Sequence, residues 1–326
     1  SGSSVVSGQL SPSGDLSAFK LVEDTANSGH FIKRRIDTSS SFLSNSIFVK
    51  AGEVTKIGIS ESGSTDDYAS FDLSNGVLIA SGGNPSFSIK EMSNDWYRIS
   101  LTSDSQLSRN DFNLALLSDD YVSGIPYSQS YQGDGTSGAY IYGAQLEQGS
   151  YPTSYIPNYG TSAGITRSEE FATGAGDAST FNDSEGVLMA EISALANDGT
   201  SQRISISNGT SSNNRVVIEY DEAFGLVKFW VTGSGTTNGE VQISGVQQTE
   251  LNKISVLYKA NVIKIYINGF NVGNGNGIVV PTGLDNLKFE QAIGGNNFYG
   301  NTKQIQYFDS ALNDSDLETL TSWTSF

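Results

Sequence analysis

Short segments of alternating apolar and polar residues, separated by turn residues, run through most of this 326-residue chain and restrict what it can fold into. The clearest is 262–268, where Ile263, Ile265 and Ile267 fall on one face of an extended strand. Asn-Gly steps recur between such segments and favour the positive φ angles of tight hairpin turns. Many short strands closed by hairpins are typical of antiparallel sandwiches. The sequence therefore predicts an all-β fold.

A single short helix is predicted near the C-terminus, over 313–321. Asn313 is suited to cap its first turn, and Leu317 and Leu320 lie about one turn apart. The rest of the chain carries no comparable helical period, so the helix is an addition to a β-protein.

A break in the strand pattern divides the chain into two halves of similar size. Pro and Gly residues interrupt any alternation over 155–168. Each half is long enough to bury a core of its own. We predict two tandem antiparallel β-sandwiches, a first domain over 1–160 and a second over 169–326, joined by a linker over 161–168.

The charge balance and the missing residue types exclude several functions. The chain has 18 Lys and Arg against 35 Asp and Glu, a net charge of −17, which disfavours nucleic acid as a partner. No apolar stretch is long enough for membrane insertion. The absence of cysteine and the single histidine, His30, exclude thiol nucleophiles and clustered His metal sites. The second half has no histidine, which argues against an imidazole base there.

The first half carries an ordered set of motifs over 48–53, 71–76, 94–100, 133–138, 140–147 and 151–157. This set resembles the jelly-roll, carbohydrate-binding-module-like domain of bacteriophage tail and other virion proteins, over about 20–168. One departure is that the Trp-containing first strand of that family is missing. The resemblance implies a jelly-roll fold and a place in a virion.

The second half carries motifs over 263–269, 293–295, 298–308 and 310–317. They resemble the closing strands and short helix of concanavalin A-like (laminin-G-like) domains, the fold of many lectins and glucanases. The resemblance implies a second sandwich. Such sandwiches bind glycans, bind proteins or serve as structural spacers, so the fold alone does not decide the function.

Two tryptophans are candidates for stacking on sugar rings. Trp230 alternates with Val227, Phe229 and Val231, so it points outward if those three form the core. Trp96 also alternates away from its apolar neighbours, but it opens a family motif, and structural packing is the favoured alternative for it.

The loop 294–299 is a second candidate binding element. Asn296 and Asn297 supply amides, Phe298 and Tyr299 supply aromatic rings, and the preceding glycines make the backbone accessible. Sugar hydroxyls need donors and acceptors together, which this mixture provides. Ordinary turn chemistry is the alternative interpretation.

Acidic pairs in expected turns are the candidates for a metal site. Asp66 with Asp67, and Asp119 with Asp120, provide the oxygen ligands that calcium prefers. Both resembled families often hold a structural Ca²⁺, so a calcium ion is one option and a solvated turn is the other. No EF-hand spacing is present.

These observations predict a non-catalytic adhesion protein of a phage virion, a tail, fibre or surface component that binds polysaccharide on a host or in the environment. The expected location is the virion surface, outside the cell, and the net charge favours a neutral or weakly charged glycan. A structural decoration or assembly protein without glycan binding is the first alternative. A polysaccharide lyase or glycosidase is the second. A homo-oligomer, such as a trimer in the virion, stays open.

Overall fold

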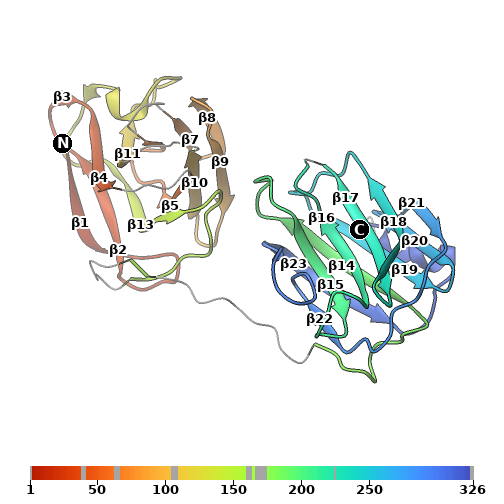
Figure 1. The fold of residues 1–326 in the computed structure, drawn as a ribbon. Coiled ribbons are helices and arrows are strands. Elements are labelled where there is room, and N and C mark those ends of the chain that lie inside the picture. Colours follow the sequence, from red (N-terminus) through yellow and green to blue (C-terminus); the bar gives the residue numbers. More distant parts are fainter. Residues whose placement is uncertain are drawn as a thin grey trace. The chain divides into compact units, whose positions relative to one another are not determined.

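The structure is a computed structural model that describes residues 2–37, 42–61, 67–103, 109–158, 164–165, 175–223 and 225–323. It divides into two compact units, Ser1–Arg167 and Ser168–Phe326, with the division inside the linker predicted over 161–168. Antiparallel strands dominate both units (Figure 1). The all-β prediction is confirmed.

The first unit is a sandwich of two antiparallel sheets. The larger sheet has the order β1 (Ser3–Gln9), β2 (Ala18–Glu23), β13 (Gly138–Gln148), β5 (Leu43–Lys50), β10 (Tyr97–Ser103) and β9 (Ser86–Glu91). The smaller has the order β4 (His30–Asp37), β11 (Arg109–Leu117), β6 (Lys56–Glu61), β7 (Tyr68–Asp72) and β8 (Val77–Gly82). The minor elements are β3 (Asn27–Ser28), η1 (Pro126–Ser128) and β12 (Tyr131–Gln132).

The strand order of this unit is that of a jelly roll. The quartet β2-β13-β5-β10 packs on the quartet β4-β11-β6-β7, and neighbouring strands other than the hairpin β6-β7 are distant in sequence. Leu21, Ile47 and Ile99 from the first sheet share a core with Ile57 and Phe71 from the second. The jelly-roll prediction is therefore confirmed for the first unit.

The second unit is also a two-sheet sandwich. One sheet has the order β21 (Phe270–Asn276), β20 (Val262–Ile267), β19 (Asn252–Lys259), β14 (Glu185–Ala194) and β23 (Gly300–Phe308). The other, which we call the Trp230 sheet, has the order β18 (Thr236–Ile243), β17 (Val227–Gly233), β16 (Arg215–Tyr220), β15 (Gln202–Ser207) and β22 (Asn286–Lys288).

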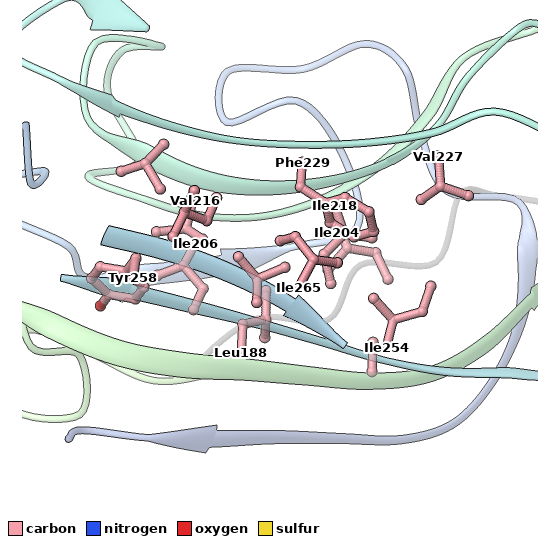
Figure 2. Packing of buried hydrophobic residues seen from close by; sticks show 14 of the residues in the cluster. Leu188, Ile204, Ile206, Val216, Ile218, Val227, Phe229, Ile254, Tyr258 and Ile265 are labelled. Carbon is pink, nitrogen blue, oxygen red and sulfur yellow. The ribbon is translucent and has the colours of Figure 1, made fainter. Parts of the chain in front are cut away.

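The core of the second unit follows the alternation in the sequence. The predicted residues Ile263, Ile265 and Ile267 are at most 6% exposed and belong to the core cluster. Figure 2 shows side chains of β15, β16 and β17 meeting those of the opposite sheet, with Phe229 and Ile265 among them. Full burial of each aliphatic side chain contributes about 1.5–3 kcal/mol. Since successive strand residues point to opposite faces, the intervening residues of β15–β17 lie on the outer face of the Trp230 sheet.

The predicted helix is present as α1 (Asp314–Thr321). The Asn313 side chain accepts a hydrogen bond from the Asp316 backbone N–H at 3.0 Å, as expected of an N-cap. Leu317 is fully buried against Val187, Leu257 and Tyr266, which covers the outer face of the other sheet. Within the described ranges, no helix has the length and hydropathy that crossing a membrane requires.

Candidate functional site

The strand register assembles charged residues around Trp230 on the outer face of the Trp230 sheet. Val217 pairs with Trp230, and Glu219 pairs with both Arg203 and Lys228 on its two neighbouring strands. The residues between them, such as Ile218 and Phe229, are in the core. We call Arg203, Arg215, Glu219, Trp230, Gln291 and Asn296 the outer-face cluster.

Trp230 faces away from the core, as its alternation predicts, but it is not an open platform. It is only 6% exposed. The guanidinium carbons of Arg203 and Arg215 lie 5.2 and 5.5 Å from the centre of its ring. Each such contact contributes about 0.5–2 kcal/mol. The expectation of an exposed stacking surface is therefore wrong, because two cations cover the ring, and Trp230 acts as their support.

Arg203 connects the strands to the loop 294–299. Its Nε donates to the Glu219 carboxylate and its Nη1 to the Gln291 side-chain oxygen. With the Asn296 side-chain oxygen turned toward Arg203, that oxygen accepts from Nη1 at 2.7 Å and from Nη2 at 3.2 Å. The Arg203 backbone N–H also donates to the Asn296 carbonyl at 2.8 Å. The structure thus brings Trp230 and the predicted loop together through one arginine.

The loop reaches this position through residues that tolerate left-handed backbone. Gly294, Gly295 and Asn296 have φ angles of 98°, 84° and 53°. Glycine adopts such angles without strain, and Asn does so more readily than most residues. The turn leaves Asn296 beside Arg203 and places Tyr299 at the surface, 49% exposed.

The other predicted loop residues differ in what they offer a ligand. Asn297 forms a parallel bridge with Arg203, and its Nδ2 lies 3.5 Å from the Tyr299 hydroxyl. Phe298 turns inward instead, with its ring centre 6.0 Å from that of Tyr220 and 6.3 Å from that of Phe289. Phe298 is thus partly buried against the core, and its role as a ligand contact stays a prediction.

Burial sets the electrostatics of the cluster. The Glu219 side chain is 3% exposed. Burial raises the pKa of Glu219, Arg203 opposes that shift, and the nearby Asp221 carboxylate adds to it. Asp221 is itself ion-paired with Lys228, and its side chain is 6% exposed. Burial and the like charge of Arg203 lower the pKa of Arg215, although an arginine stays protonated in proteins.

Trp96, the other tryptophan candidate, is sealed in the first unit. It lies outside the main core, as its alternation predicts, but only 1% of it is exposed. It packs in a cluster with Phe48, and Tyr140, Tyr142 and Tyr155 cover that cluster. This burial favours structural packing, the alternative preferred for Trp96 from the sequence, and a role of Trp96 in carbohydrate binding stays a prediction.

The predicted calcium ligands do not form a cluster. Asp66 lies outside the described residues. Asp67 is 4% exposed, and its Oδ1 accepts from the Asn84 backbone N–H at 3.1 Å. Asp119 and Asp120 lie in one turn, in which the Asp120 carboxylate accepts from the Ser118 hydroxyl at 2.5 Å. Over the part of the chain that the structure describes, no three His, Cys, Asp or Glu side chains are grouped for a metal ion. The described donors do not fit calcium, and a bound Ca²⁺ stays a prediction.

The sequence reasoning missed Arg203, Arg215, Glu219 and Gln291. A signal for three of them was present, because Arg203 alternates with the apolar residues of its strand, and so do Arg215 and Glu219. This alternation places them on an outer face, but only the register places that face around Trp230. Gln291 lies outside any strand and carried no such signal.

No protein-family model matches this sequence, and no curated protein matches it either. Among solved structures, the CBM40 of the Ruminococcus gnavus IT-sialidase bound to α2,3-sialyllactose is 16% identical, with a TM-score of 0.37, over 43% of this chain and 84% of that chain. A heptameric SAP-like pentraxin from Limulus polyphemus is 14% identical, with a TM-score of 0.33, over 42% and 70%. Sheep galectin-11 in complex with glycerol is 10% identical, with a TM-score of 0.29, over 38% and 90%. Each similarity covers less than half of this chain, and none assigns it a ligand.

Proposed function

We propose that this chain is a non-catalytic carbohydrate-binding protein whose second unit binds glycan at the outer-face cluster. One observation carries the proposal: Trp230 contacts two guanidinium groups, and one of them, that of Arg203, is hydrogen-bonded to the side chains of Gln291 and Asn296. Sugar hydroxyls and ring oxygens accept from guanidinium N–H groups and exchange hydrogen bonds with amides. Because Arg203 is already fixed by Glu219, binding costs little side-chain entropy there.

The state of the carboxylates supports binding over hydrolysis. Glycoside hydrolysis generally needs two carboxyl groups that flank the reacting bond. Glu219 and Asp221 are the buried carboxylates of this face, and each is ion-paired, to Arg203 and Lys228. A carboxylate held by a cation within the sheet is poorly placed to reach a glycosidic oxygen.

The finer part of the proposal is adhesion at a virion surface. The motifs of the first half support it through their resemblance to virion domains. Single shallow sites bind weakly, and several linked copies raise avidity by about 10²–10⁴. An outward-facing cluster on a sandwich suits such repeated contact.

Affinity electrophoresis and a glycan array with the full chain test the proposal. We expect retention by at least one polysaccharide, and about 10-fold weaker binding by Trp230→Leu, because the support of both arginines is lost. Trp323→Leu is the matched control: Trp323 is 45% exposed, lies over Lys253 of the other sheet, and its loss should leave binding unchanged. Product analysis after long incubation should show no cleavage.

Two results would overturn the proposal. The first is wild-type protein that no polysaccharide retains. The second is a Trp230→Leu variant that is folded and binds as the wild type does. Release of oligosaccharide products would replace binding alone with an enzymatic function.

A further inference from the structure

Arg215 is the one arginine of the outer-face cluster whose hydrogen-bond donors are left unused. Its Nε and Nη1 atoms are buried from solvent, and no described residue accepts a hydrogen bond from either. Arg203, which also contacts the Trp230 ring, donates to Glu219, Gln291 and Asn296. The contact with the Trp230 ring favours the charge of Arg215 but satisfies none of its N–H groups.

Arg215 is also the cation without a counter-ion on this part of the sheet. Arg203 is paired with Glu219, Lys228 with Asp221, and Lys288 with Glu290 at 3.1 Å. Among the described residues, no carboxylate lies within ion-pair distance of Arg215. Arg98 of the first unit is also half-buried without a described carboxylate partner, but its Nη2 donates to the Ser46 hydroxyl at 2.9 Å, whereas the Arg215 side chain has neither a described ion pair nor a described hydrogen bond.

A bound anion supplies what Arg215 lacks. Leaving buried donors unsatisfied costs free energy, and the cost is greater for a charged group. A guanidinium donates two parallel N–H···O bonds to one carboxylate from Nη2 together with either Nε or Nη1, because the Nε–H and Nη1–H bonds point to opposite sides. A neutral hydroxyl accepts one bond and leaves the charge uncompensated. The uncompensated charge of Arg215 therefore favours a carboxylate over a neutral ligand group.

We propose that Arg215 selects a sugar residue that carries a carboxylate, such as a uronic acid; this rests on glycan binding at the outer-face cluster. The proposal refines the sequence-based expectation of a neutral or weakly charged polysaccharide. The net charge of −17 repels a dense polyanion as a whole, whereas Arg215 attracts one carboxylate locally. A glycan with carboxylates on part of its residues satisfies both conditions.

The test compares polysaccharides with their carboxyl-reduced forms, which keep the same backbone without the charge. Hyaluronan and xanthan, which carry carboxylates on part of their residues, are used, each native and reduced, with the full chain on affinity gels. We expect the wild type to bind at least one native polymer about 10-fold more tightly than its reduced form, the effect of one charge-assisted contact. Arg215→Gln should bind both forms equally weakly, and Arg215→Lys should keep part of the preference.

The Nε–H resonance of Arg215 gives a second readout. It is identified in the ¹⁵N spectrum by its disappearance in Arg215→Lys, and the remaining spectrum reports whether that variant is folded. The protein is titrated with oligosaccharides obtained by hydrolysis of the native polymer, and we expect the Arg215 Nε–H resonance to shift. Oligosaccharides from the carboxyl-reduced polymer should leave this resonance in place.

The outcomes separate this inference from the proposed function. If the wild type binds neutral or reduced polymers as tightly as native ones, the carboxylate preference is wrong and glycan binding stands. If Arg215→Gln or Arg215→Lys retains the full preference, the assignment to Arg215 is wrong. If no native polymer is bound but neutral glycans are, the inference fails alone, and if nothing is bound, both fail.

Discussion

The two units each place a tryptophan on the outer face of a sheet, and the two tryptophans are covered in opposite ways. Trp96 and Trp230 are 1% and 6% exposed. Aromatic and aliphatic side chains cover Trp96, whereas two guanidinium groups cover Trp230. Alternation along a strand shows on which face of the sheet a residue lies. The side chains that pack over that residue determine whether the face is apolar and closed or presents polar groups to a ligand.

The cover of the first unit comes from the chain that follows β13. The Ser44 hydroxyl donates to the Gly149 carbonyl at 3.0 Å, and the Tyr155 ring centre lies 5.9 Å from that of Phe48. This segment crosses the outer face of the larger sheet and turns it into a second small core. In the second unit the corresponding cover is made of charged side chains, which exchange partners more easily than packed hydrocarbon does.

The largest expected effect is the loss of stability when the packed tryptophan of the first unit, Trp96, is removed. Trp96→Ala should destabilise the first unit by about 3–5 kcal/mol, because it leaves a cavity among packed aromatic rings. Hydrogen exchange of the full chain, read by mass spectrometry, should show faster exchange in the first unit only. Glycan retention by the second unit should not change. Equal loss of retention in this variant would contradict the assignment of binding to the second unit.

The two units should also differ in how their stability depends on pH, through Glu219 in the second unit and Asp134 in the first. Burial raises the pKa of Glu219, so its contribution to stability is complete below the ordinary glutamate pKa and is lost as the pH rises through the folded-state value. Hydrogen bonds from Ser137 and Thr136 lower the pKa of Asp134, so its contribution is present above the ordinary aspartate pKa and is lost on acidification.

The expected outcome is an opposite pH dependence of the two variants. Relative to wild type, Glu219→Gln should be more stable at pH 7 than at pH 4, because the variant no longer places a charge in a buried site. The stability that Asp134→Asn loses relative to wild type should be larger at pH 7 than at pH 3. Urea unfolding at each pH measures both, with exchange assigned to the two units, and a shared sign would contradict the pKa directions.

The smallest expected effect concerns Tyr299, the exposed ring of the loop. Tyr299→Ala removes a side chain that is 49% exposed and whose hydroxyl lies 3.5 Å from the Asn297 Nδ2. Glycan binding should weaken by about 2–3-fold, the loss of one exposed contact, with no change in stability. Titration on the array glycan that binds best measures it. A loss as large as that of Trp230→Leu would move the centre of the site to the loop.

Much of the fold follows from the sequence because its causes are local. Alternation over 262–268 predicts the buried isoleucines, and the Asn313 cap predicts the start of α1. The same rule correctly turns Trp230 away from the core. These features depend on residues that are near one another in the chain.

The candidate site follows less well because its causes are distant. The cover over Trp230 comes from two other strands, and only the register Val217–Trp230 brings Arg203 and Arg215 to it. Gln291 and Asn296 reach Arg203 through a loop whose path depends on three consecutive left-handed residues. The cover of Trp96 has a distant cause too, because Tyr155, near the C-terminal end of the first unit's sequence, packs against the cluster that contains Trp96.

The bond between Arg203 and Gln291 spans 88 residues of the chain. Contacts of this range form only after the intervening strands have paired, so the site is completed late in folding. A nascent or truncated chain that ends before Gln291 has the strands around Trp230 but lacks both Gln291 and Asn296, two of the three side chains that orient Arg203. Glycan binding would then be a property of finished molecules alone, and ligand retention would serve as a direct assay for complete synthesis and folding of the second unit.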